Sequence, residues 1–220
     1  FAVWTSLAAL LFRWRRDRAA DRPLIGATVV SAVVLANTRP LSMVFLAMIV
    51  AIVVTFAGWS IVRRFLGDRR SWWVIGAIAV GSVPAVVWSL LFGRAGTLAG
   101  GGLIDRQANA LLTLASFADD WFSQMIAHFG WLDTGPVVIA VWVWLILVAS
   151  LVTLAAGSGR PWRSTVLVAS VAAVVIVPIV LQYPAARHGH VLWQGRYFLA
   201  IAVGVPVLAA LTVDLGELGT

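Results

Sequence analysis

Residues 63–92 read RRFLGDRRSWWVIGAIAVGSVPAVVWSLLF, which is two pairs of arginines followed by a long uncharged stretch. A helix rises about 1.5 Å per residue and the hydrocarbon core of a bilayer is about 30 Å thick, so about 20 apolar residues are needed to cross it. The stretch 71–92 meets this length, and the same alternation of apolar runs and arginine clusters recurs along the chain. The pattern predicts an all-α, polytopic bundle of transmembrane helices.

The composition agrees with this prediction and excludes several classes of protein. Of 220 residues, 61% are hydrophobic and only 11% are charged, and the mean hydropathy is +0.97. A soluble domain carries about 25% charged residues. The chain therefore cannot be a soluble enzyme, a disordered region or a nucleic-acid-binding domain, and no nucleic acid is expected as a partner. Cysteine is absent, which excludes disulfides and thiolate metal sites.

The apolar runs predict about seven spans, of which the first is truncated. They cover residues 1–12, 23–36, 41–62, 71–92, 135–156, 164–182 and 197–213. Because the chain starts with Phe1 inside an apolar run, we expect residues 1–220 to form a single transmembrane domain that is the back portion of a larger protein.

The arginines orient the predicted spans. Eleven of the sixteen fall in three clusters, at residues 13–22, 63–70 and 160–163. Cytoplasmic loops carry an excess of arginine and lysine, so these clusters are expected on the cytoplasmic side. Residues 93–134 and 183–196 then lie outside. Residues 23–62 either cross the membrane twice or dip in and return, and in both cases the turn from Asn37 to Pro40 lies away from the cytoplasm. This predicts a multi-pass protein whose remaining arginines mark the outer face.

The long outer loop, residues 93–134, is predicted to contain an amphipathic helix over about residues 103–129. Apolar residues from Ile104 to Phe129 recur at alternating spacings of four and three, which places them on one helical stripe. The polar face of this helix is acidic, which favours packing onto protein over adhesion to anionic lipid. The helix either only seals the bundle or walls a groove for a lipid-linked substrate, and the sequence leaves both interpretations open.

Two outer arginines are candidate substrate-binding residues. Arg196 stands directly against the last span with Gln194 and Tyr197 beside it, and Arg39 lies in the outer turn. A guanidinium next to aromatic rings can bind a phosphate group through two hydrogen bonds. The plainer interpretation is that Arg196 only extends toward the interface.

The remaining ionisable groups of the outer loops are weaker candidates. Asp133 is either the N-cap of the following helix or a contact to a substrate hydroxyl, and it is a weak candidate for a catalytic residue. His128, His188 and His190 show no metal-binding spacing and are expected in solvated loops, so neither a metal nor a cofactor is expected.

Three motifs give the chain a resemblance to a known family. They are Thr38-Arg39-Pro40 at the outer turn, Phe129 to Thr134 (FGWLDT) before a span, and Gln194 to Phe198 (QGRYF) at the last span. In their order and membrane context they resemble the C-terminal part of the bacterial predicted membrane proteins of domain of unknown function 2142. That family is similar to the C-type glycosyltransferases, which use polyprenyl-phosphate sugars on the outer side of the membrane.

The resemblance implies a function in the synthesis of cell-envelope polysaccharide or glycolipid. The partners would be a polyprenyl-phosphate sugar, a glycan or lipid acceptor and the bilayer of the bacterial cell (inner) membrane. Such enzymes place an acidic catalytic residue in the first outer loop, so we expect the base upstream of residue 1 and consider Asp133 only second. The alternatives are a transporter or flippase of lipid-linked glycans and a non-catalytic membrane assembly subunit.

Overall fold

The described residues of the computed structural model are mainly helical. The described residues are 1–14, 18–38, 41–96, 102–103, 112, 114, 116, 138–158, 161–186, 190–191 and 199–217. They divide into two compact units, residues 1–95 and 96–220.

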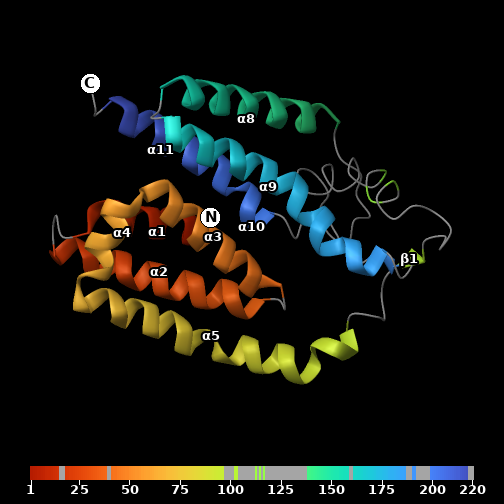
Figure 1. Cartoon of the computed structure of the whole chain (residues 1–220), viewed down its shortest axis with the longest axis horizontal. Helices are drawn as coiled ribbons and strands as arrows, with labels where there is room; N and C mark the ends of the chain where they lie inside the picture. Colours follow the sequence, from red (N-terminus) through yellow and green to blue (C-terminus); the bar gives the residue numbers. More distant parts are fainter. Residues whose placement is uncertain are drawn as a thin grey trace. The chain divides into compact units, whose positions relative to one another are not determined.

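Helices make up the described part of the first unit (Figure 1). They are α1 (Ala2–Arg13), α2 (Arg18–Thr38), α3 (Ser42–Ala57), α4 (Trp59–Leu66) and α5 (Arg69–Gly96). Helices α1, α2 and α3 pack against one another, and α4 contacts both α1 and α3. The buried core of this unit is built from large apolar side chains, including Trp4, Leu10, Ile49, Val53 and Phe56.

Aromatic contacts and small polar groups join these helices. Trp14 meets Phe65 edge to face at 4.8 Å between ring centroids, which fixes the end of α1 against α4. The hydroxyls of Ser6 and Ser31 lie 3.5 Å apart and join α1 to α2. Small residues and hydroxyl contacts of this kind are typical of helix pairs in membranes, where lipid is as apolar as the side chains.

The second unit contains four described helices and a short strand pair (Figure 1). The elements are β1 (Gly102–Leu103), α8 (Val138–Ser158), α9 (Pro161–Ala186), β2 (His190–Val191), α10 (Leu199–Ala202) and α11 (Gly204–Glu217). Helix α11 packs on α8 and α9 around the buried Leu167 and Leu208. The break between α10 and α11 is explained by Pro206, which has no N–H to donate to the carbonyl of Ala202.

The predicted all-α class is confirmed for the described residues, and the number of spans is not. Two helical segments are long and apolar enough to cross a bilayer, Arg69–Leu91 and Pro161–Tyr183. A third candidate is α3 with α4, if the bent pair is counted as one span. The other described apolar helices are shorter: Ala2–Arg13, Arg22–Thr38, Val141–Gly157 and Leu199–Val213. Each of the seven apolar runs contains a described helix, but seven spans stay a prediction.

The run 41–62, predicted as one span, is divided into two helices by a break at Gly58. The axes of α3 and α4 differ in direction by 112°. Gly58 has φ 85° and ψ 157°, a conformation that is open to glycine and strained for other residues. Helix α4 therefore leaves the line of α3, with Val62 and Phe65 buried and Arg63 and Arg64 exposed.

Two residues lie in other elements than the sequence predicts. Leu103, expected near the start of the interfacial helix, lies in β1, where it pairs with His190 of β2. Arg163, expected in a cytoplasmic loop, lies in the first turn of α9, buried, with Cζ 5.4 Å from the Trp162 ring centroid. Of the rest of the predicted helix over 103–129, only Leu112, Leu114 and Ser116 are described, and each is helical.

Candidate functional site

The site residues predicted from the sequence lie outside the described residues. These are Arg39, Asp133, Gln194, Arg196 and Tyr197. The described residue next to one of them is Thr38, the last residue of α2 and the first of the Thr38-Arg39-Pro40 motif. Thr38 therefore places the described part of the candidate site at the end of α2.

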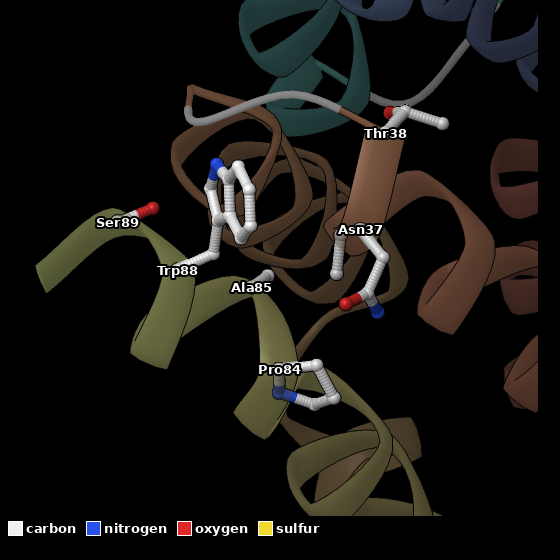
Figure 2. Close-up of a pocket in the computed structure, with 7 residues that line it drawn as sticks. Asn37, Thr38, Pro84, Ala85, Trp88 and Ser89 are labelled. Atoms are coloured by element: carbon white, nitrogen blue, oxygen red, sulfur yellow. The ribbon is translucent and has the colours of Figure 1, made fainter. Parts of the chain in front are cut away.

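A pocket lies where the end of α2 meets α5 in the first unit. Its volume is about 280 Å³ and its lining comprises Ala36, Asn37, Thr38, Pro84, Ala85, Trp88 and Ser89. Figure 2 shows the Asn37 side chain extending from α2 toward α5, and the Trp88 indole standing up from α5 beside it. Both helices begin at arginines, and the pocket lies toward their other ends.

Close contact between α2 and α5 positions this pocket. A Cβ placed on Gly81 would come 2.5 Å from Cγ2 of Val33, so only glycine lets the two backbones approach this closely. The Nδ2 of Asn37 donates to the carbonyl of Gly81 at 2.9 Å and to the carbonyl of Val33 at 2.8 Å. One amide group thus connects the two helices directly beside the pocket.

Pro84 shapes the wall of the pocket that α5 contributes. Proline has no N–H, so the carbonyl of Val80 lacks the donor that a regular helix would supply, and a bend is the usual result. Together with Gly81, it makes this part of α5 differ from a regular apolar span. Neighbouring helices and side chains re-satisfy such freed backbone groups in membrane proteins.

The described lining of the pocket is neutral and suited to sugar-like hydroxyl groups. The Thr38 hydroxyl donates to the carbonyl of Leu35 at 2.7 Å and lies 3.0 Å from Oγ of Ser42. Asn37, Thr38 and Ser89 offer amide and hydroxyl groups, and Trp88 offers an aromatic face with an N–H at one edge. A charged ligand group would need its counter-charge from outside this lining, and Arg39 is the next residue of the chain.

The family model for Predicted membrane protein (DUF2142) matches residues 1–205. The chain belongs to this family. No curated protein and no solved structure matches it.

Membership of DUF2142 confirms the resemblance seen in the motifs and the membrane nature of the chain. The match covers the first unit and most of the second, so it includes Thr38-Arg39-Pro40 and the stretch from Gln194 to Phe198. The family description names no reaction, and the likeness to C-type glycosyltransferases stays an expectation.

No metal centre is found in the described part of this DUF2142 protein. Within it, no group of three or more histidine, cysteine, aspartate or glutamate residues could hold an ion. Of the three histidines, His128 and His188 lie outside the described residues and His190 forms part of β2.

The pocket of the second unit is almost wholly apolar. It has a volume of about 320 Å³ between α8, α9, α10 and α11, and includes Trp144, Val148, Val174 and Val205. The side chains that line it carry no titratable group. The pocket in the first unit therefore remains the better candidate for a polar substrate.

The sequence predicted Arg39 as a site residue but did not predict the pocket that is lined by the residues just before it, Ala36 to Thr38. Asn37 offered a signal, since an amide at the end of an apolar run is costly unless it has a partner. Trp88 gave no specific signal, because tryptophan is common near the ends of membrane-spanning helices. Gly81 gave no signal of its own, because its importance depends on Val33 of another helix.

Proposed function

We propose that this DUF2142 protein is a membrane glycosyltransferase that uses a polyprenyl-phosphate-linked sugar at the outer face of the bacterial inner membrane. It would act in the synthesis of cell-envelope polysaccharide or glycolipid. The observation that carries the proposal is the pocket at the end of α2, because its lining includes the polar side chains of Asn37, Thr38 and Ser89 and the chain continues from Thr38 into Arg39.

The proposed orientation follows from the arginines. Helices α2 and α5 start at Arg18 and Arg69, in clusters that the positive-inside rule places in the cytoplasm. The opposite ends, with the pocket, then face outward, where polyprenyl-linked donors are consumed by C-type enzymes. A multi-pass arrangement is part of the proposal.

Different residues would bind the sugar and the phosphate of the donor. Asn37, Thr38 and Trp88 would contact the sugar, since amide and hydroxyl groups bind its hydroxyls and an indole packs against its ring. Arg39 of the first unit and Arg196 of the second unit are each a candidate for binding the phosphate, and Gln194 and Tyr197 are close to Arg196 in sequence. A guanidinium that binds the leaving phosphate stabilises the charge that develops as the bond breaks.

The transfer itself exchanges one bond of the sugar for another. The acceptor hydroxyl oxygen forms a bond to the anomeric carbon while the bond from that carbon to the phosphate oxygen breaks. Polyprenyl phosphate leaves with the electron pair, and the hydroxyl proton passes to a carboxylate base. Within residues 1–220, Asp133 is a weak candidate for this base.

A transporter or flippase of lipid-linked glycans is the second candidate, and one feature favours it. Many transporters contain membrane-spanning helices that are broken into two parts, and a break at Gly58 separates α3 from α4. This break, however, adjoins Arg63 and Arg64 rather than the middle of a span. The third candidate, a non-catalytic assembly subunit, predicts that changes to the outer arginines affect complex formation alone.

The test uses the full-length protein in proteoliposomes with labelled polyprenyl-phosphate sugars and envelope glycan acceptors. We expect label in the acceptor, and a loss of about 100-fold or more in Arg196→Ala, the range found when a stabilising donor to a developing charge is removed. Arg187→Ala, a change to another arginine of the same loop, is the matched control and should transfer normally. Flipping of the lipid without transfer would favour the transporter, and normal transfer by a folded Arg196→Ala protein would overturn the role of Arg196.

A further inference from the structure

The first unit contains a second, larger cavity that the proposed function does not use. It has a volume of about 700 Å³ and lies between α3 and α5, with residues of α1, α2 and α4 completing its lining. Its lining is apolar except for the hydroxyls of Thr28 and Ser82. Such a surface fits a hydrocarbon chain rather than a sugar or phosphate group.

The length of this cavity matches one leaflet of a bilayer. Its lining extends from Met43 to Val54 along α3 and from Val74 to Val86 along α5. At about 1.5 Å per residue, the two walls are roughly 16 and 18 Å long, against a hydrocarbon core of about 30 Å. Val50 and Val83, one on each wall, are exposed at 39% and 51%, so the cavity opens on the surface between α3 and α5.

Helix α4 closes one end of the cavity and has two chemically different faces. Val62, Phe65 and Leu66 contribute to the lining of the cavity. Arg63 and Arg64, between them in sequence, are exposed. The 112° turn at Gly58 allows this arrangement, because a helix continuing straight from α3 could not cap the cavity.

The surface beyond this end is strongly basic. Arg69 and Arg70 at the start of α5 are exposed, like the two arginines of α4. Asp68 is the one acidic residue in the stretch 59–73, and its Oδ1 accepts a hydrogen bond from the backbone N–H of Arg70 at 3.1 Å. Trp72 and Trp73 follow, exposed at 59% and 78%, as is typical of side chains at the level of lipid headgroups.

We infer that this cavity binds a hydrocarbon chain of an anionic phospholipid, with the lipid phosphate against Arg63 and Arg64. The apolar cavity matches the hydrocarbon chain of such a lipid. The basic surface beyond α4, the helix that caps the cavity, matches its phosphate. In the predicted orientation the lipid comes from the cytoplasmic leaflet, opposite the pocket beside Thr38. The inference is independent of the proposed glycosyltransferase activity.

The headgroup is tested by native mass spectrometry of the full chain released from nanodiscs. Phosphatidylglycerol and phosphatidylcholine with identical chains are offered in equal amounts. We expect about five-fold or greater retention of phosphatidylglycerol, which one arginine near an anionic surface can supply. The double variant Arg63→Gln, Arg64→Gln should lose this preference, and Arg22→Gln, a change to an exposed arginine of α2, should keep it. Equal retention of both lipids, or an unchanged preference in the double variant, would overturn the inference.

The chain-binding part is tested by filling the cavity. Ala79 lines it, whereas Ala77 lies on the same helix outside its lining, and both are exposed. Ala79→Trp should retain less phosphatidylglycerol than Ala77→Trp, and equal retention would show that the lipid does not enter the cavity. Displacement of phosphatidylglycerol by an equal amount of polyprenyl phosphate would assign the cavity to a substrate lipid and would also overturn the inference.

Discussion

The contact between Gly81 and Val33 predicts a large effect from adding one methyl group. In Gly81→Ala the new Cβ would lie 2.5 Å from Cγ2 and 3.0 Å from Cγ1 of Val33, so α5 must move away from α2. Overpacking of this kind costs about 1–3 kcal/mol. The shift also weakens the 2.9 Å hydrogen bond from Asn37, and an interhelical hydrogen bond in a membrane contributes about 0.6 kcal/mol on average.

Gly76→Ala is the matched control, because nothing lies within 4 Å of a Cβ at that position. Replacing glycine by alanine inside a helix stabilises both variants by about 1 kcal/mol. The difference between their free energies of unfolding therefore reports the contact with Val33. We expect Gly81→Ala to have a free energy of unfolding about 2–3 kcal/mol below that of Gly76→Ala in mixed detergent micelles.

A second substitution tests the cause of this difference. The Cβ of Val33 would lie 3.4 Å from the new methyl group, an ordinary contact, so Val33→Ala should remove most of the cost of Gly81→Ala. Equal stability of Gly81→Ala and Gly76→Ala, or additive effects in the double variant, would refute the reasoning.

Three further predictions concern the bend, a buried hydroxyl and the orientation. Gly58→Ala should lower the free energy of unfolding by about 1–3 kcal/mol, since the φ of 85° at this position is strained for alanine. An unchanged free energy of unfolding would contradict the backbone conformation assigned to Gly58. Ser82→Ala should be as stable as the parent or about 1 kcal/mol more stable, because the buried Oγ of Ser82 has no hydrogen-bond partner in the described part of the chain. Ser170→Ala, which loses a 2.7 Å hydrogen bond to Val166, should be destabilised in the same unfolding assay, and the reverse order would be evidence against this assignment. Since the chain has no cysteine, Ser60→Cys and Ser89→Cys can be labelled singly with an impermeant thiol reagent in oriented vesicles. We expect Ser89→Cys to react from outside and Ser60→Cys from the cytoplasmic side, and reaction of both from one side would contradict the orientation.

The helices were predictable from the sequence because their signal is local. A run such as 71–92 has enough apolar length to require a helix in lipid, whatever its neighbours are. The bend at Gly58 was not predicted, although Arg63 and Arg64 follow it closely. Hydrophobicity alone could not distinguish a straight helix from an apolar helix followed by a short amphipathic one.

The pocket was not predictable because it depends on contacts between helices distant in sequence. Asn37 and Gly81 are 44 residues apart, and their hydrogen bond depends on how α2 and α5 approach each other. Arg39 was selected for its charge, which a sequence shows directly, and for its place in a turn that the arginine clusters predict to lie away from the cytoplasm. The functional roles of Arg39, Arg196 and Asp133 stay predictions, because all three lie outside the described residues.

The central claim is that the pocket beside Thr38 receives the head of a polyprenyl-phosphate sugar. Photo-crosslinking tests it most directly, with the full-length protein and a polyprenyl phosphate that carries a photoreactive group next to the phosphate. The proposal predicts that the modified peptides contain residues 36–40 or 84–89, and that unlabelled polyprenyl-phosphate sugar prevents the modification. Labelling that maps to the arginine clusters at residues 13–22 or 63–70, or that competitor does not reduce, would contradict the claim.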